Sequence, residues 1–351
     1  MSYRVSIRWL QTRGLSPLSI VRDTVNLLIF LSALTCGCKG GASESRRSEI
    51  LMGTKVEVVV RGSGALDFGR AIDAAFGEMR KIERAMNRFD PDSELCLLNA
   101  AAGHGSMKIS ADMMNVLLAA NRANKLSGGA FDPTVGPAMK LWSRMPTRFP
   151  TPDERATIRG IVGWNNVIID TTNQSVSLAA AGVALDLDGI AKGYIADKGL
   201  DAIRRMGIPA ALIDAGGDVA FYSSEGYPPW KVGISDPGKW GAKPILTLKL
   251  SNGALATSGN AWRYWDVGDK RYPRIIDPAT LLPPENPPLS ASAYSDNDTD
   301  ADAWATASVV LGGKIATVEG KSAPALLIYT ANGAFIVNDR WKELFGRPVS
   351  P

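Results

Sequence analysis

LDLDGIAKGY, from Leu185 to Tyr194, is the stretch from which the fold of this chain can be worked out. Asp186 and Asp188 end a β-like run, and Lys192 follows within about one helical turn. The pattern predicts a strand that leads through an acidic corner into a helix of roughly residues 189–206. Free N–H groups at the start of that helix, together with Lys192, favour a bound phosphate. The more common interpretation is that Asp188 caps the helix and Lys192 lies at the surface.

The composition is that of an ordinary globular protein. The chain has 351 residues, 45% hydrophobic and 21% charged, and its net charge of +4 includes no long basic run. We therefore do not expect nucleic-acid binding. The only histidine, His104, excludes a multi-histidine metal site, and a Ser-His-Asp triad would have to use it. Cys96 is the one cysteine outside the N-terminal segment and is expected to be a small core residue.

The N-terminal segment differs in kind from the rest. Four arginines precede the apolar run VNLLIFLSAL, and TCGCKGG follows it. This order is typical of an export signal, and the Gly37–Cys38 junction suggests a bacterial lipoprotein signal with Cys38 lipidated after cleavage. An uncleaved anchor is the alternative. We expect a signal at 1–38, a linker at 39–48 and a folded domain at 49–346, anchored to the membrane on its periplasmic side in the bacterial cell envelope.

Hydrophobic periodicity predicts several elements of this domain. Val56, Val58 and Val60 alternate along a half-buried strand. Apolar residues at helical spacing predict an amphipathic helix over about residues 67–86, and Ser110 is a good N-cap for a second helix ending near Leu126. The segment LLIYTANGAFIVN is typical of a hairpin with its turn at Asn-Gly.

Further strands are expected in NVIIDTT, SVSLAAAGVALDLD, AALIDAGGDVAFY, WKVGISD and ILTLKLS, and a surface loop in LLPPENPPLS. The elements lack the regular βαβ rhythm of a doubly wound fold. We therefore predict an α+β fold, a single domain of mixed, largely antiparallel sheet with packed helices.

Five corners rich in glycine or aspartate contain the polar residues that could perform chemistry. Besides the opening stretch they are GGAFDPTVG, IDAGGDVAF, LATSGN and DADAWATASVVLG. Each is weak evidence alone, because most such corners only let the backbone turn. Neither common glycine fingerprint for nucleotides is present, so a bound dinucleotide would require another fold.

The last of these corners contains a possible metal site. Asp302 and Thr306 are four residues apart and share one face of a helix. A carboxylate and a hydroxyl are hard oxygen ligands that suit Mg²⁺. The alternative is that Asp302 caps the helix of residues 303–311, and spacing alone favours the cap.

Nine segments, taken together and in order, resemble the ApbE-type FAD:protein FMN transferases. They are MGTKVEVVV, MNRFDPDSELCLLN, GGAFDPTVGPAMKLW, LDLDGIAKGYIAD, IDAGGD, WKVGISDP, ATSGN, IIDPAT and DADAWATASVVLG, and they run from Met52 to about Gly312. The resemblance implies a periplasmic lipoprotein enzyme with one α+β catalytic domain. Such an enzyme transfers FMN from FAD to a threonine or serine hydroxyl of a partner flavoprotein, with Mg²⁺ as cofactor and release of AMP.

The resemblance also implies a set of site residues. The FAD contacts would be Met52, Phe89, Ala130, Phe131, Asp132, Asp186, Lys192 and Ile276. The metal ligands would be a backbone oxygen of Gly189 and the side chains of Asp302 and Thr306, which reverses the preference for a cap. Asp186 and Asp277 are the candidates for the general base.

The chain departs from the family pattern at several positions. Arg274 stands where histidine is common, Leu281 and Asp188 replace small residues, and Phe89 replaces tyrosine. Arg274 cannot act as a base near neutral pH, although it could bind a phosphate.

Two alternatives therefore stay open. A hydrolase would use water at the same site and release FMN and AMP, and a flavin-binding lipoprotein would hold FAD without turnover. The ordered motifs argue against a purely structural lipoprotein.

Overall fold

The computed structural model describes residues 43–143, 148–239, 243–259, 264–320 and 323–349. These residues belong to one compact unit. The expected signal segment, including Cys38, lies outside the described residues, so its boundary stays a prediction. Residues 43–48, expected as the end of a linker, instead begin a strand. That strand is rich in charged residues, as is common at the edge of a sheet.

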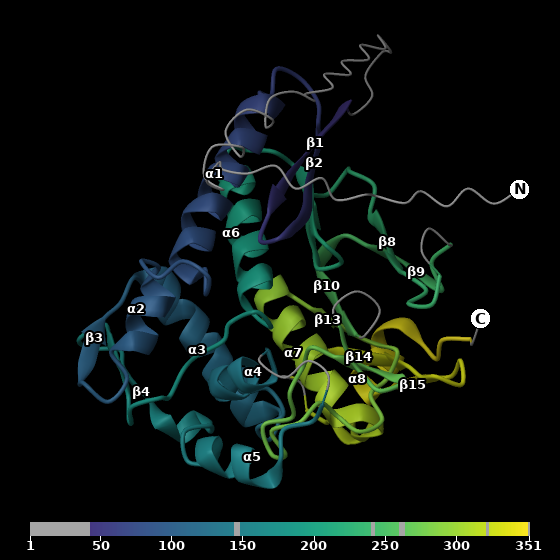
Figure 1. Cartoon of the computed structure of the whole chain (residues 1–351). Coiled ribbons are helices and arrows are strands. Elements are labelled where there is room, and N and C mark those ends of the chain that lie inside the picture. Colours follow the sequence, from purple (N-terminus) through teal and green to yellow (C-terminus); the bar gives the residue numbers. More distant parts are fainter. Residues whose placement is uncertain (1–42, 144–147, 240–242, 260–263, 321–322, 350–351) are drawn as a thin grey trace, which may run out of the picture. The chain divides into compact units, whose positions relative to one another are not determined.

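An eight-stranded sheet is the centre of the fold (Figure 1). Its order is β1-β2-β6-β7-β10-β13-β14-β15, and all neighbouring strands are antiparallel. The strands are β1 (Ser43–Leu51), β2 (Thr54–Gly62), β6 (Ala210–Ala215), β7 (Val219–Ser223), β10 (Asn252–Gly259), β13 (Ser290–Ser295), β14 (Ala325–Tyr329) and β15 (Phe335–Val337). The predicted α+β class is confirmed.

Smaller sheets accompany this one. They are formed by β3 (Ser106–Lys108) with β5 (Ser175–Leu178) and β4 (Val167–Asp170), by β8 (Trp230–Ile234) with β9 (Leu246–Leu250), and by β11 (Tyr264–Val267) with β12 (Lys270–Pro273).

Helices cover the sheet and extend beyond it. The α-helices are α1 (Phe68–Met86), α2 (Glu94–Ala100), α3 (Ala111–Leu126), α4 (Gly136–Ser143), α5 (Pro152–Arg159), α6 (Ala191–Arg205), α7 (Asp298–Leu311) and α8 (Asp339–Phe345). Helix α6 packs between α1 and α7, and α7 lies against β10 and β13 (Figure 1). Short 3₁₀ helices occupy Pro133–Val135, Trp164–Asn166 and Gly312–Thr317.

Side chains cap the starts of two of these helices, and the cap of the second, Ser110, was expected from sequence. Asp67 accepts a hydrogen bond from the Arg70 N–H at the start of α1, and Ser110 accepts one from the Met113 N–H at the start of α3. Side-chain oxygens at these positions satisfy N–H groups that have no partner within the helix. The predicted hairpin is also confirmed, because β14 pairs with β15 and Gly333 adopts a positive φ of 80° in the turn.

Two cores lie on opposite faces of the sheet. Val56, Val58 and Val60 belong to the large core, which also contains the buried residues of α1, α6 and α7. Val59 points to the other face, where a second core includes Trp230 and, from α8, Trp341 and Phe345. Strand β2 is therefore more deeply buried than the expected half-buried strand, because it has apolar contacts on both faces.

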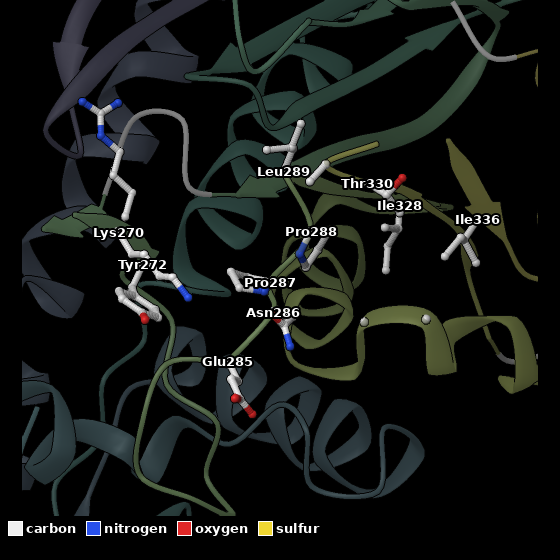
Figure 2. Close-up of a pocket in the computed structure, with 14 residues that line it drawn as sticks. Lys270, Tyr272, Glu285, Asn286, Pro287, Pro288, Leu289, Ile328, Thr330 and Ile336 are labelled. Atoms are coloured by element: carbon white, nitrogen blue, oxygen red, sulfur yellow. The ribbon is translucent and has the colours of Figure 1, made fainter. Parts of the chain in front are cut away.

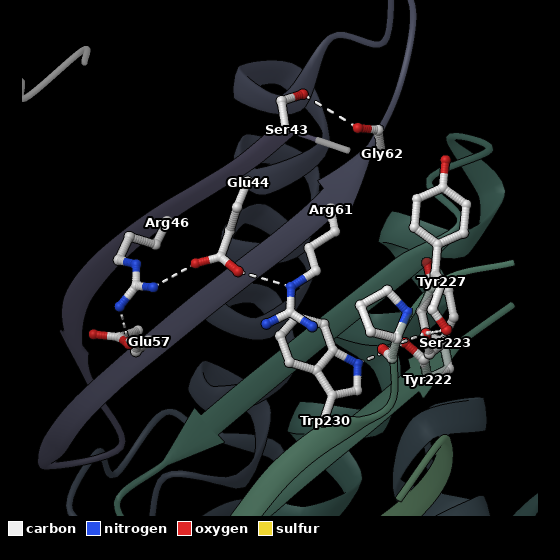
Figure 3. Close-up of polar contacts among 11 residues, drawn as sticks. Ser43, Glu44, Arg46, Glu57, Arg61, Gly62, Tyr222, Ser223, Tyr227 and Trp230 are labelled. Carbon is white, nitrogen blue, oxygen red and sulfur yellow. Dashed lines mark hydrogen bonds and ion pairs between the residues drawn. The ribbon is translucent and has the colours of Figure 1, made fainter. Parts of the chain in front are cut away.

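Arg61 links the edge of the sheet to β8 (Figure 3). Its guanidinium lies over the Trp230 ring, 3.6 Å from the centroid, and its Nε–H donates to Glu44 at 2.7 Å. The Trp230 indole N–H donates to the Tyr222 carbonyl on β7. A cation over an indole with both groups hydrogen-bonded is a stabilising arrangement, so it holds the β8–β9 hairpin against the sheet.

The opening stretch does not contain the predicted strand. Leu185 and Leu187 are buried, but their backbone is irregular and α6 begins only at Ala191. The Asn99 side chain provides the hydrogen bonds that a neighbouring strand would otherwise make, because it donates to the Leu185 carbonyl and accepts from its N–H. Asp188 does not cap α6, since the cap position is Ile190 and it has no side-chain hydrogen bond.

The proline-rich segment 281–290 is also less exposed than predicted. Leu281 is completely buried at a positive φ of 60°, and its carbonyl accepts a hydrogen bond from the Trp142 indole N–H at 3.2 Å. It packs in a third apolar cluster with Trp265 and Ile276. Burial of Leu281 anchors the start of this segment to α4.

Candidate functional site

Helices α6 and α7 cap each other where they cross. The Asp302 carboxylate on α7 accepts the Gly193 N–H of α6 at 3.2 Å, and Asp197 on α6 accepts the N–H groups of Asp298 and Thr299 at 2.8 Å each. Both carboxylates thus satisfy N–H groups at a helix start and lie at its positive end. Reciprocal capping fixes the position of one helix relative to the other.

Gly193 permits this close approach. A Cβ at this position would overlap the Asp298 backbone carbonyl. Asp302 is therefore a cap, but of α6 and not of its own helix, since Asn297 caps α7 and accepts the Asp300 N–H at 2.8 Å. The expectation that Asp302 caps the helix of residues 303–311 is wrong.

The three predicted metal ligands lie near one another at this crossing. A Cβ on Gly189 would lie 2.9 Å from the Thr306 hydroxyl, so the Gly189 backbone and the hydroxyl are adjacent. Asp302 is only 1% exposed and lies one turn before Thr306 on α7. Ser258 on β10 adds a second hydroxyl, 3.5 Å from that of Thr306.

A carboxylate, hydroxyls and a backbone carbonyl are the donor set that Mg²⁺ prefers. The residues present therefore fit this ion. Among the described residues there is no group of three or more His, Cys, Asp or Glu side chains placed to hold a metal, so a metal here would rely on neutral oxygens besides Asp302.

Lys192 lies among carboxylates at the same crossing. Its ammonium group donates to Asp218 and lies 3.6 Å from Asp302 Oδ1. Asp218 is buried and also accepts the Thr257 N–H at 3.4 Å. Lys192 thereby connects α6 to the IDAGGD and LATSGN corners. From sequence it was expected to be a surface residue or a phosphate contact.

Burial dominates the electrostatics of this cluster. Burial raises the pKa of the Asp302 carboxyl, and the positive charge of Lys192 opposes that rise. Asp298 is completely buried, neither of its carboxylate oxygens has a hydrogen-bond partner in the described part of the chain, and burial together with Asp197 raises its pKa well above the usual range. A bound cation or a proton would relieve this concentration of buried negative charge.

Arg88 holds the acidic turn of the opening stretch. Its Nη1 lies 3.3 Å from Asp186 Oδ2, and its Nη2 lies 3.0 Å from Asp188 Oδ2. The other Asp186 oxygen accepts the Asp188 N–H at 3.0 Å. Burial and the neighbouring Asp188 raise the pKa of Asp186 to about 6, while Arg88 and Arg274 lower it.

The AFD segment packs directly beneath this corner. The Phe131 ring is buried, and an atom of it would lie 3.3 Å from a Cβ on Gly189. Asp132 accepts hydrogen bonds from the N–H and hydroxyl of Thr134, so its carboxylate starts the 3₁₀ turn, and burial raises its pKa. Ala130 lies between this turn and the end of α3. The described contacts of Asp132 are thus structural.

Met52 and Phe89 lie in different environments. Met52 and Gly53 both have positive φ angles, 53° and 66°, in the β1–β2 turn, and the Met52 N–H donates to Glu83 at 2.7 Å. Phe89 is 79% exposed, and its ring lies under the Arg88 guanidinium, 4.5 Å from centroid to Cζ. A large exposed ring beside a charged site is available to stack on a ligand.

The segment after β12 contains the remaining predicted residues, Arg274, Ile276 and Asp277. Arg274 is exposed, 5.7 Å from the Trp265 ring, and its charge reaches Asp186. Ile276 is buried. The Asp277 carboxylate accepts the Ala279 N–H at 2.8 Å, so it stabilises its own turn. In the described part of the chain, no hydrogen bond or ion pair joins Met52, Ile276 or Asp277 to the α6–α7 crossing.

Sequence reasoning missed Arg88, Asp218 and Ser258 as individual site residues. Asp218 and Ser258 belong to corners that were already suspected, so the signal for them was present. Arg88 lies within the MNRFDPDSEL motif, directly before Phe89, but its partner Asp186 is 98 positions away. No local spacing indicates such a pair.

A separate pocket of about 390 Å³ lies beside the β11–β12 hairpin (Figure 2). Lys270 and Tyr272 line one side, Pro287 and Leu289 belong to the proline-rich segment, and Ile328 lies on β14. None of the predicted site residues lines this pocket. Among the helices that the structure describes, none is both long enough and apolar enough to cross a membrane.

Comparison with known proteins gives a consistent result. Residues 52–326 match the ApbE family. A protein of Treponema pallidum named FAD:protein FMN transferase is 32% identical over 310 residues, which are 83% of this chain and 85% of the relative. A Haemophilus influenzae protein of the same name is 31% identical over 268 residues, 73% of this chain and 77% of the relative.

Solved structures show the same architecture. The ApbE protein of Thermotoga maritima has a TM-score of 0.78 at 30% identity, over 87% of this chain and all (100%) of the other. The flavin transferase ApbE of Vibrio cholerae has a TM-score of 0.74 at 24% identity, over 86% and 99% of the two chains, which supports the fold.

Proposed function

This chain belongs to the ApbE family, and we propose that it transfers FMN from FAD to a threonine or serine hydroxyl of a partner flavoprotein in an Mg²⁺-dependent reaction that releases AMP. The curated relatives are named as enzymes of this transferase class. Flavin transfer follows from that membership, whereas the metal, the leaving group and the acceptor are parts of our proposal.

One observation carries the proposal. Gly189 and Lys192 come from the opening stretch and Thr306 from the last of the five corners, and the crossing of α6 and α7 brings them together around the buried Asp302. The crossing thus combines a cation, hard oxygen donors and a helix start. Such a combination suits a diphosphate with its metal.

In the proposed reaction one bond forms and another breaks. The acceptor oxygen attacks the phosphorus of the FMN half, the bond from that phosphorus to the bridging oxygen breaks, and AMP leaves with that oxygen. The hydroxyl proton passes to a base or to solvent. Mg²⁺ held by Asp302, Thr306 and the Gly189 carbonyl would neutralise negative charge on the diphosphate.

The residues of the chain have distinct parts in this proposal. Lys192 binds a phosphate oxygen as a point charge, and Arg274 binds another with its fixed guanidinium donors. Phe89 offers an exposed ring for stacking on the flavin nucleotide. Asp186 and Asp277 remain the candidates for the base, but each carboxylate is engaged in hydrogen bonds in this structure.

The proposal is tested by mixing the purified protein with FAD, Mg²⁺ and a threonine-containing acceptor peptide, followed by mass spectrometry. FMN attached to the peptide, with an equal amount of AMP, is the expected result. Free FMN and AMP without labelled peptide would instead identify a hydrolase. Unchanged FAD with tight binding would identify a flavin-binding protein.

We also propose that the mature protein is lipidated at Cys38 and lies on the periplasmic side of a bacterial membrane. The basic N-terminal segment, the short apolar run and the Gly37–Cys38 junction support this location.

A further inference from the structure

Arg88 contacts two of the proposed FAD-binding residues, Asp186 and Phe89, but the proposed reaction gives Arg88 itself no role. It follows the end of α1 at Met86, and its guanidinium reaches the acidic turn before α6. Two of its nitrogens bond two different carboxylates, those of Asp186 and Asp188. Its ring neighbour is Phe89, 4.5 Å from the guanidinium carbon.

The burial of this arrangement makes it more than a surface ion pair. The Asp186 side chain is 7% exposed and that of Arg88 is 24% exposed, so solvent screens their interaction only in part. A guanidinium stays charged and presents donors in a planar fork, which suits one contact to each of two carboxylates. The Arg88 Nε–H is buried without an acceptor among the described residues, so the two carboxylates and the ring define where the guanidinium lies.

This geometry restricts what Asp186 can do. One oxygen of its carboxylate accepts the Asp188 N–H and the other accepts Arg88. Both oxygens of Asp186 are therefore held in place, which fixes the position from which this side chain can contact a ligand. Arg88 also covers one face of the exposed Phe89 ring and leaves the rest of the ring to a ligand.

We propose that Arg88 is a positioning residue for FAD, which holds the Phe89 ring and the Asp186 carboxylate in a fixed relation so that both contact the flavin nucleotide. The inference rests on the proposed function, because both residues are taken as FAD contacts. Arg88 acts through them and does not touch the reacting phosphorus.

The test measures FAD binding without turnover, from the change in flavin fluorescence on titration with protein in the absence of Mg²⁺ and acceptor. Arg88→Met keeps the aliphatic stem but removes the charge and the donors, and should weaken FAD binding about tenfold. Arg88→Lys keeps the charge but lacks the planar fork that places one donor on each carboxylate, so its affinity should fall between that of the Arg88→Met variant and that of the wild type. Arg84→Met, which replaces an exposed arginine on the last turn of α1, is the matched control and should bind FAD as the wild type does.

A double variant separates positioning from a general loss of charge. If Arg88 acts through the turn, Arg88→Met combined with Asp188→Ser should bind FAD no more weakly than Arg88→Met alone, because the interaction is already lost. In steady-state transfer, Arg88→Met should raise KM for FAD while kcat changes by less than about threefold. Thermal melts of each variant establish that the chain is folded.

Wild-type affinity for FAD in a folded Arg88→Met protein would overturn the inference. A large loss of kcat with an unchanged KM for FAD would also overturn it, since that result would place Arg88 in the chemical step. Failure of the proposed function is seen separately, as a wild-type protein that binds FAD but transfers no FMN to the acceptor.

Discussion

Lys192 and Asp302 face each other across the crossing of α6 and α7, with 3.6 Å between the ammonium nitrogen and Oδ1. The second oxygen of Asp302 accepts the Gly193 N–H, so one carboxylate serves a cation and a helix start at the same time. A divalent ion bound at Asp302 would compete with Lys192 for the first oxygen. Asp218, which also binds Lys192, offers the ammonium group a second carboxylate.

Replacement of Asp302 by asparagine should abolish Mg²⁺-dependent transfer. Asparagine keeps an oxygen that can accept the Gly193 N–H, so the helix cap persists, but the negative charge that binds the metal is lost. We expect the rate of FMN transfer to fall by at least about 100-fold. Even mutation of residues that only hydrogen-bond to metal ligands commonly lowers metal affinity or activity by about 10–100-fold. Transfer rates measured across a titration of Mg²⁺ check this. Asp300→Asn, on the same helix, is the control, and unchanged activity of Asp302→Asn at limiting Mg²⁺ would leave Asp302 as a helix cap alone.

Arg274 should bind phosphate and should not act as a base. A guanidinium remains charged throughout the neutral range, so Arg274 itself should contribute no step to the pH profile of transfer. Arg274→His should bring at most a small change in turnover, because positioning and the metal carry most of a phosphoryl transfer. Arg271→His, on the neighbouring hairpin, controls for the substitution itself. A large gain in kcat for Arg274→His with unchanged FAD affinity would show that a base had been restored.

Asp186 should make the fold less stable as pH rises from about 4 to about 6. Its pKa is raised from 3.8 to about 6 by burial and Asp188, against the opposing charges of Arg88 and Arg274, so the folded state keeps the proton to higher pH than the unfolded state. Linkage then lowers the free energy of unfolding over this window, by on the order of 3 kcal/mol at most. Urea unfolding of the wild type and Asp186→Asn at pH 4 and pH 7 measures the difference. Parallel pH dependence of the two proteins would contradict the prediction.

Gly193→Ala should destabilise the protein by about 2–3 kcal/mol, since overpacking of this kind forces the backbone apart. The added methyl group would overlap the Asp298 carbonyl, which cannot move without disturbing the start of α7. Gly77→Ala is the matched control, because a Cβ there meets nothing within 4 Å and lies inside α1. That control should gain about 0.5–1 kcal/mol from helix propensity. Denaturant unfolding of both variants measures the contrast, and equal stabilities would show that the crossing tolerates a wider spacing.

Cys38→Ser should abolish lipidation in cells fed a labelled fatty acid. The thiol of this residue is the acceptor expected from the signal pattern, and serine cannot form the same thioether. Cys36→Ser is the matched control and should keep the label. Label that persists on Cys38→Ser but vanishes on Cys36→Ser would move the anchor by two residues.

Local pattern determined the elements whose partners are close in sequence. The spacing of apolar residues defined α1, the cap at Ser110 marked the start of α3, and Asn332–Gly333 marked the last hairpin. The spacing of Asp302 and Thr306 placed both on one face of α7. These features follow from sequence because helix periodicity, capping and tight turns depend on residues only a few positions apart.

Tertiary structure alone decided how those elements meet. Leu185 and Leu187 alternate as in a strand, yet the side chain of Asn99 takes the place of a neighbouring strand. The Arg88 bridge and the reciprocal capping of α6 and α7 join residues about a hundred positions apart. A periodic pattern reports which side of an element is buried, but not which element covers it. The partner of a charge depends on where two helices cross, and here the small size of Gly193 sets that crossing.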